Sequence, residues 1–422
     1  MIIPSIDLVR GRTVQLVGGE AEAIDAGDPV PILERFSIAG EVAVIDIDAA
    51  RGEDSNETVI KDLCRRAQIR VGGGIRDVET ALAWLDAGAA KVIIGTAAAP
   101  ELLSQLPADR VIVALDSREG RVVTHGWRTS TPDSVLARVA ELKGLVGGFL
   151  VTFVELEGRM RGTDLDRARD VIVAAGQARV TIAGGIATAE EVATIDRLGG
   201  DAQVGMALYS GELGLAEAIV APLVSDRDDG LWPTVVVDEL GAALGLTWSS
   251  VASLDRAVER RQGIYQSRRR GLWEKGATSG ATQDLLGVAV DCDRDALRFT
   301  VRQHGDGFCH LDTRSCWGED AGIGRLSRRL ARLADEPESE SNTVRLLNDA
   351  VLLSAKLREE ADELAAASSR RDVTEEIADV IYFTLVKAVA AGVDLADVER
   401  ELDQRTLRVK RRPMESKQGY GG

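Results

Sequence analysis

The sequence lacks the features that would place the protein in a membrane or on nucleic acid. No run of about 18 apolar residues appears. Basic residues are the minority charge, with 51 lysines and arginines against 68 aspartates and glutamates and a net charge of −17. Because no long basic face can neutralise phosphates, we expect no nucleic-acid and no membrane partner, although phosphorylated small molecules remain candidate substrates. The chain opens into a strand pattern without a secretory signal, which predicts a soluble, cytoplasmic protein of roughly two to four domains.

Cysteine is also scarce, yet three of the four cysteines fall in the segment 291–316, DCDRDALRFTVRQHGDGFCHLDTRSC. If DCDRD is extended, its side chains alternate between two faces, so the aspartates point one way and the first cysteine the other. The acids suit Mg²⁺ and the thiolates suit zinc, where three protein ligands leave a position open for water. Buried apolar cysteines or disulfides are the alternative, but an odd cluster without a secretory signal disfavours disulfides. We therefore predict a metal-dependent hydrolase. The candidate ligands are Cys292, Cys309 and Cys316 for Zn²⁺, and Asp291, Asp293 and Asp295 for Mg²⁺.

An internal repeat organises the first 225 residues. The segment at 70–98, RVGGGIRDVETALAWLDAGAAKVIIGTAA, returns at 181–209 as TIAGGIATAEEVATIDRLGGDAQVGMALY. Each half alternates buried strand patterns such as VAVIDID and RVIVALD with amphipathic helix patterns. Two such halves predict one (β/α)₈ barrel with a parallel core.

Polar residues of this barrel fall where its strands end. Asp7 and Asp116 end the first and fifth strands, at the rim where barrel chemistry occurs, and can act as general base and general acid. Glycine clusters end other strands and would let backbone N–H groups approach a phosphate, although ordinary turn geometry also explains glycines there. Two facing clusters suit a substrate phosphorylated at both ends. The candidate phosphate-binding residues are Gly73, Gly74, Gly95, Thr96, Gly184, Gly185 and Gly205.

These segments resemble a known family. IPSIDLVRGRTVQLVGG, VIDIDAARGEDSN, VGGGIR, VIIGTAA, ALDSREGRVVTHGW and AGGI are similar to the phosphoribosylformimino-aminoimidazole carboxamide ribotide isomerase of histidine biosynthesis, over residues 1–225. The resemblance implies that Asp7 is the general base and Asp116 the general acid of an Amadori rearrangement, assisted by Thr152. One departure is Glu157-Gly158-Arg159, where the family has a DGT or EGT turn. Arg159 either adds a phosphate contact or crowds the site.

The polar stretch SDRDDG at 225–230 marks a boundary, and a second domain is expected over 229–320. YQSRRRGLWEKGATSG, VDCDRDA and CHLDTRSCWGE resemble phosphoribosyl-AMP cyclohydrolase. The resemblance implies a small α+β domain in which a zinc-bound hydroxide attacks C6 of the purine and opens the N1–C6 bond. His310 is the expected proton carrier, with a structural histidine as the alternative. Ser267, Arg268 and Arg270 are candidate phosphate donors, with plain surface charge as the alternative. Ala277 replaces the acid of the family's GETSG motif, which would weaken binding or shift the pH optimum.

A third, helical region follows the spacer LADEPESESN, and we expect a domain over 338–414. Its acids lie at helical spacing on two segments, and the second stripe continues through Phe383 and Val386. Solvated charge is the ordinary explanation for one such helix, but acids on an otherwise apolar stripe are costly unless they bind cations. EExxE and ExxD resemble the all-α nucleotide pyrophosphohydrolases, in particular phosphoribosyl-ATP pyrophosphatase. The implied Mg²⁺ ligands are Glu359, Glu360, Glu363, Glu376 and Asp379, and Lys356 is a candidate phosphate partner.

The three resemblances describe consecutive reactions of histidine biosynthesis on phosphoribosyl nucleotides. We therefore predict a three-domain enzyme that performs both hydrolyses and the isomerisation, and the resemblance implies a homodimer. The alternatives are a bifunctional hydrolase with a catalytically silent barrel, and a nucleotide-binding regulator that has lost its chemistry. A regulator would have no use for an open zinc site.

Overall fold

The computed structural model describes the chain except for residues 20, 125, 128, 270, 306, 319, 338–340 and 410–422. Its contacts define two compact units. The first holds Met1–Val237, Leu246–Gly305 and the described residues from Leu407, and the second holds Asp238–Gly245 and the described part of 306–406. Among the described residues, no helix combines the length and apolar character needed to cross a membrane.

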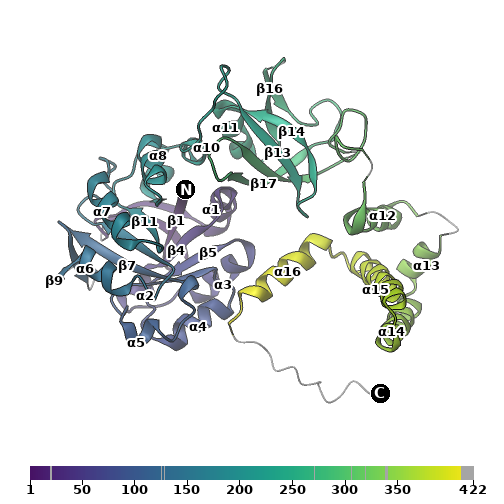
Figure 1. The fold of residues 1–422 in the computed structure, drawn as a ribbon, viewed down its shortest axis with the longest axis horizontal. Coiled ribbons are helices and arrows are strands. Elements are labelled where there is room, and N and C mark those ends of the chain that lie inside the picture. The colour runs from purple at the N-terminus through teal and green to yellow at the C-terminus, as the bar shows by residue number, and fades with distance from the viewer. Residues whose placement is uncertain are drawn as a thin grey trace. The chain divides into compact units, whose positions relative to one another are not determined.

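Eight parallel strands close into a barrel at the N-terminus, as predicted (Figure 1). The ring closes because the fifth barrel strand pairs with the sixth, for example at Asp116 and Thr152. The strands are β1 (Ile2–Val9), β4 (Val42–Asp46), β5 (Ile69–Gly72), β6 (Lys91–Ile94), β7 (Val111–Arg118), β10 (Gly148–Phe153), β11 (Arg179–Ala183) and β12 (Asp201–Val204). The outer helices are α1 (Pro29–Phe36), α3 (Glu57–Arg66), α4 (Val78–Asp86), α5 (Pro100–Leu103), α6 (Val135–Leu142), α7 (Leu165–Ala175), α8 (Ala189–Arg197) and α10 (Leu215–Val220), with the short α2 (Ile47–Arg51) and α9 (Met206–Ser210) at strand ends.

The barrel repeats its local structure in each half, which accounts for the repeat in the sequence. Ile93, Ile112, Leu150 and Ala183 come from four neighbouring strands and form one hydrophobic cluster of the barrel interior. An antiparallel hairpin follows the first strand of each half: β2 (Arg12–Val17) with β3 (Ala21–Gly27), and β8 (Arg121–Thr124) with β9 (Thr129–Ser134). Because these hairpins continue from the C-terminal ends of β1 and β7, they border the mouth of the barrel.

The middle region is built on a four-stranded sheet in the order β14 (Ala243–Ser249), β13 (Trp232–Asp238), β18 (Leu297–Gln303), β17 (Gln283–Val290). Helix α11 (Val251–Arg260) packs beside the small hairpin of β15 (Ile264–Ser267) and β16 (Gly271–Glu274). Tyr265 and Phe299 are fully buried, with ring centroids 5.4 Å apart, and hold the hairpin against the sheet. The region is therefore rich in β structure with one covering helix.

The structure corrects one local expectation, because DCDRD is not extended. Val290 of β17 pairs with Leu297 of β18, so residues 291–296 form the turn between two antiparallel strands. Arg294 has a φ of 67°, in the left-handed region that a strand excludes. The predicted alternation of faces was wrong, since the closure of a hairpin forces the chain to turn here.

The C-terminal region is all helical, as predicted. Its elements are α12 (Gly322–Asp335), α13 (Asn342–Asn348), α14 (Ala350–Ala366), α15 (Arg370–Ala390) and α16 (Leu395–Leu407). A core of Leu330, Leu346, Leu353, Phe383, Leu385 and Val386 joins α12 to α15. The stripe of α15 that carries Glu376 and Asp379 does continue through buried Phe383 and Val386.

Candidate active sites

A cavity of about 1450 Å³ occupies the mouth of the barrel and is lined by Asp7, Asp116 and Thr152. Asp7 lies near the end of β1 and Asp116 near the end of β7. Because β1 and β7 are four strands apart in the ring of eight, the two carboxyl groups lie on opposite sides of the mouth. The volume exceeds that of most drug-sized pockets, which suits a long substrate.

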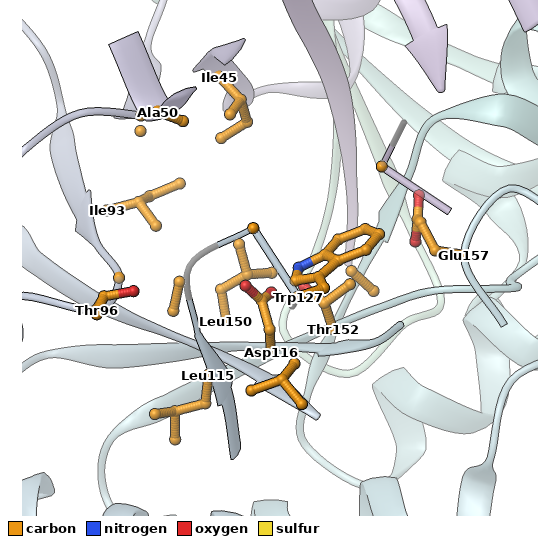
Figure 2. Close-up of a pocket in the computed structure, with 18 of the residues that line it drawn as sticks. Ile45, Ala50, Ile93, Thr96, Leu115, Asp116, Trp127, Leu150, Thr152 and Glu157 are labelled. Carbon is orange, nitrogen blue, oxygen red and sulfur yellow. The ribbon is translucent and has the colours of Figure 1, made fainter. Parts of the chain in front are cut away.

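Burial dominates the ionisation of both aspartates. Loss of hydration raises the pKa of Asp7 to about 7. Burial also raises the pKa of Asp116, and hydrogen bonds from Trp127 and Thr152 partly offset that rise. Figure 2 shows Trp127 and Thr152 beside Asp116. Carboxyl groups with raised pKa values hold their protons to higher pH than ordinary carboxyl groups do, which suits them to general acid–base catalysis.

Glu157 is a third acid of this cavity, and the sequence reasoning treated it only as part of an unusual turn. Burial and the negative charges of Asp7 and Asp116 raise its pKa to about 7. Its neighbours Gly158 and Met160 line the cavity, whereas Arg159 is exposed and is not among the lining residues. The structure therefore gives no sign that Arg159 crowds the site. The signal that the sequence offered for Glu157 was its place in the turn where the resembled family has DGT or EGT.

The predicted glycines line the same cavity in two groups. Gly73, Gly74, Gly95 and Thr96 follow β5 and β6, while Gly184, Gly185 and Gly205 follow β11 and β12, on the opposite side of the ring. Gly73 and Gly184 both have φ of +98°, and a Cβ there would lie 2.2 and 2.5 Å from the backbone oxygens of Asp46 and Phe153. Only glycine fits at these two positions, so packing alone requires it. The two groups can in addition offer backbone N–H groups to two phosphates.

The turn between β17 and β18 brings together the three predicted Mg²⁺ ligands of the middle region. Carboxylate oxygens of Asp291, Asp293 and Asp295 lie within 4.8 Å of one another. Burial raises the pKa of Asp291, but the N–H groups of Ala296 and Asp295 outweigh it and hold that pKa below its usual range. The hydrogen bond with Asp291 and the charge of Asp293 raise the pKa of Asp295. Crowded carboxylates of this kind fit a hard divalent cation, which would neutralise their repulsion.

The predicted zinc ligands are partly gathered. Cys309 and Cys316 belong to the second unit and their thiols interact, while Cys292 belongs to the first. Hydrogen bonds from the Leu311 N–H and from Thr313 lower the pKa of Cys309, which favours the thiolate that binds metals. Within the described ranges, each group of three or more candidate ligands that lie close together consists of carboxylates, and none includes a cysteine. His310 Nδ1 lies 3.8 Å from Cys309 Sγ.

Among the predicted phosphate donors of the middle region, Ser267 is half-buried and Arg268 is exposed. Ser267 ends β15, and its hydroxyl accepts a hydrogen bond from the Arg269 N–H. The Arg268 guanidinium lies over the Trp248 ring, 5.2 Å from its centroid. Ala277 is exposed. Arg270 lies outside the described residues.

In the helical region, α14 and α15 bring Glu360, Glu363 and Glu376 within 4.8 Å of one another. Burial and the charges of Glu363 and Glu360 raise the pKa of Glu376. Its Oε2 is buried and has no hydrogen-bond partner, so it is a carboxylate oxygen that a cation would satisfy. Asp379 also acts on Glu376 through its charge, whereas Glu359 lies outside this group.

Lys356, the predicted phosphate partner, is held by the acids themselves. Its Nζ lies 2.9 Å from both Glu359 and Glu360, and these carboxylates raise its pKa. The lysine is therefore charged and lies directly beside the candidate cation site.

Comparisons with known proteins agree with this division of the chain. The family model described as histidine biosynthesis protein matches residues 1–214. The models of phosphoribosyl-AMP cyclohydrolase and phosphoribosyl-ATP pyrophosphohydrolase match residues 245–318 and 323–406.

Three relatives illustrate the similarity. The chain is 37% identical over 359 residues to the histidine biosynthesis trifunctional protein of Neurospora crassa, covering 81% of this chain and 38% of that protein. It is 50% identical over 207 residues to the trifunctional protein of Komagataella pastoris, covering 49% and 24%. It is also 39% identical over 225 residues to a phosphoribosyl imidazole-4-carboxamide isomerase of Gemmatimonas aurantiaca, covering 50% and 94%. The chain thus spans less than half of the two fungal relatives and nearly all of the bacterial one. It belongs to the histidine biosynthesis protein family, with a phosphoribosyl-AMP cyclohydrolase and a phosphoribosyl-ATP pyrophosphohydrolase domain after its barrel.

Proposed function

We propose that this chain carries out three consecutive steps of histidine biosynthesis. Phosphoribosyl-ATP would lose pyrophosphate, the purine ring of phosphoribosyl-AMP would be opened by water, and the resulting formimino ribotide would be isomerised. We assign these steps to domains at 338–414, 229–320 and 1–225, in that order. The order of domains is the reverse of the order of reactions.

One observation carries the isomerase assignment: the barrel keeps opposed acids with raised pKa values between two facing glycine groups. In the proposed reaction Asp116 donates a proton to the ring oxygen of the ribose and opens the ring. As the C1–O bond of the ring breaks, the nitrogen on C1 supplies its lone pair and a C1=N double bond forms. Asp7 then removes the proton from C2 to give an enolamine, which becomes the ketose as C1 takes up a proton and the 2-hydroxyl group loses one. A base with a pKa of about 7 is well matched to this task at neutral pH.

Trp127 and Thr152 orient Asp116 through their hydrogen bonds, so the acid faces the cavity in one position. Glu157 accepts or returns protons beside both aspartates, because its own pKa also lies near 7. The glycine groups hold the two phosphates of the substrate through backbone N–H groups.

For the middle domain we propose Zn²⁺ on Cys292, Cys309 and Cys316 and Mg²⁺ on the three aspartates of the turn. Zinc, when bound, supplies a hydroxide at neutral pH for attack on a purine carbon. The pair of interacting thiols and the low pKa of Cys309 support this assignment. His310, next to Cys309, is placed to carry the proton, and Ser267, Arg268 and Arg270 would hold the phosphates.

For the helical domain we propose Mg²⁺ on Glu360, Glu363 and Glu376, with Glu359 and Asp379 completing the set. Magnesium, when bound, activates water and neutralises the leaving pyrophosphate. The unpartnered buried oxygen of Glu376 supports this proposal. When substrate binds, the Lys356 ammonium group would leave Glu359 and Glu360 and pair with a substrate phosphate. A homodimer and a cytoplasmic location remain predictions.

The decisive experiment measures conversion of the formimino ribotide to its ribulosyl isomer by the full chain. We expect turnover in the wild type and none in Asp7→Asn or Asp116→Asn. If the wild type gives no turnover while both hydrolyses proceed, the barrel is a silent scaffold and the chain is a bifunctional hydrolase.

A further inference from the structure

The turn that carries the three aspartates of the middle region contains an unfavourable backbone conformation. Arg294 lies between Asp293 and Asp295 with φ of 67°. Side chains larger than asparagine seldom adopt this region, and glycine would adopt it without strain. An arginine at this position therefore requires stabilising contacts from its surroundings.

The side chain and the backbone of Arg294 both make such contacts. Its Nε and Nη2 donate to the two carboxylate oxygens of Asp196 at 2.8 and 3.0 Å, a bidentate ion pair. Its Nη1 donates to the backbone oxygen of Asp291 at 2.5 Å. The backbone oxygen of Arg294 in turn accepts from the Val224 N–H at 2.7 Å. Arg294 thus joins the start of its own turn to two segments outside the middle region.

Asp196 is a firm anchor for this contact. It lies near the end of α8 in the barrel, and only 5% of its side chain is exposed, against 25% for Arg294. The N-terminal amine of Met1 lies 2.8 Å from the same carboxylate. Two parallel hydrogen bonds fix the geometry of this ion pair, and the burial of Asp196 reduces its screening by water.

The turn needs such an anchor because its three carboxylates repel one another. Their oxygens lie within 4.8 Å, and Asp291 is oriented by hydrogen bonds from the Asp295 and Ala296 N–H groups at 3.0 and 3.1 Å. A turn free to spread would separate the acids and lose these bonds. The hydrogen bond from the Arg294 side chain to the backbone oxygen of Asp291 ties the start of the turn to its centre.

We propose that Arg294 is a positioning residue for the divalent-cation site of Asp291, Asp293 and Asp295, and that the barrel pre-organises this site through Asp196. The inference rests on the proposed function of the middle domain. It gives the barrel a role in ring opening that is independent of its own chemistry.

The test measures binding of Mn²⁺ to the full chain by titration with electron paramagnetic resonance of the free ion. The portion of binding that Asp291→Asn removes belongs to the turn. We expect Arg294→Gly, which relieves the backbone strain but removes the ion pair, to weaken that portion about tenfold. Asp196→Asn should weaken it similarly, although it changes no residue of the turn. Arg294→Lys, which keeps the charge but loses the fork, should fall between these variants and the wild type.

Glu34→Gln is the matched control, because Glu34 also forms an ion pair between the barrel and the middle region, 2.7 Å from Arg261, and Arg261 is far in sequence from the metal turn. It should leave Mn²⁺ affinity within about twofold. Hydrogen exchange of the peptide over 291–297 gives a second readout. We expect faster exchange in both Arg294→Gly and Asp196→Asn, because each variant loses the ion pair that holds the turn, and unchanged exchange in Glu34→Gln.

Unchanged affinity and exchange in Arg294→Gly and Asp196→Asn, with normal binding in the wild type, would overturn the role of Arg294 and leave the cation site standing. If Asp291→Asn removes no part of the Mn²⁺ binding, the turn holds no cation site. The positioning role of Arg294 would then be wrong as well.

Discussion

Asp7→Asn should stabilise the barrel while it abolishes isomerisation. Burial raises the pKa of Asp7 from 3.8 to about 7, so the folded protein holds the carboxyl proton more tightly than the unfolded chain does. One pKa unit corresponds to about 1.4 kcal/mol, so ionising Asp7 costs the folded state about 4 kcal/mol more than the unfolded state. Because Asp7 is only half-buried, solvent screening lowers this figure, and we expect a gain of about 2 kcal/mol for the asparagine variant at pH 8.

The pH dependence gives the sign of this effect. Well below pH 3.8 the carboxyl group is protonated in both states, so the variant and the wild type should be equally stable. The cost of ionisation appears as the pH rises from about 4 to 7 and is fully present above 7, where the advantage of the variant should be largest.

The assay is hydrogen exchange of peptides from β1 and β7 in the full chain at pH 5 and pH 8, corrected for the intrinsic rate, since exchange reports the free energy of local opening. Asp25→Asn is the control. Asp25 is an exposed acid of the barrel whose pKa is lowered by its hydrogen bond with Arg12, so its contribution is lost as the pH falls and its variant should gain nothing at pH 8. An Asp7→Asn barrel that opens as readily as the wild type at pH 8 would refute the desolvation of Asp7.

Three further predictions concern the other features. Glu157→Gln should lower kcat for the isomerase at least tenfold and simplify its pH profile, because one of three coupled carboxyl groups is removed; pH–rate curves check this. Cys309→Ser or removal of zinc by a chelator should abolish ring opening while pyrophosphate release persists, and loss of both activities together would contradict separate sites. Glu376→Gln should abolish pyrophosphate release, measured with a phosphate-coupled assay, and leave ring opening intact; equal loss of both would argue that the acids only support the fold.

The sequence predicted the fold best where a pattern repeats over many residues. The buried strands, the paired glycines and the opposed aspartates recur in both halves of the barrel, and each was found from that recurrence. The metal turn was harder. Its three acids were identified correctly as a group, but the alternation that suggested a strand came from a hairpin turn, and only the pairing of Val290 with Leu297 reveals this. Arg294 was invisible as well, because its partner Asp196 is distant in sequence.

Glu157 was missed for a different physical reason, since it lies where the two halves of the barrel differ. Asp7 pairs with Ile45 on the next strand, and Asp116 pairs with Thr152, so Ile45 and Thr152 hold equivalent positions. By the same offset, Ala50 is the counterpart of Glu157, and all four residues line the cavity. Threonine hydrogen-bonds to Asp116, whereas isoleucine offers Asp7 nothing.

This difference explains the electrostatics of the mouth. Burial acts on both aspartates, but only Asp116 receives hydrogen bonds that offset it, while burial alone acts on Asp7. One half of the repeat thus keeps a bare carboxyl group and the other adds a hydroxyl donor and a third acid. A repeat in the sequence reveals the scaffold that the two halves of a site share. The two aspartates differ in their roles because of residues that the halves do not share. These residues can be recognised only when the register of the strands is known.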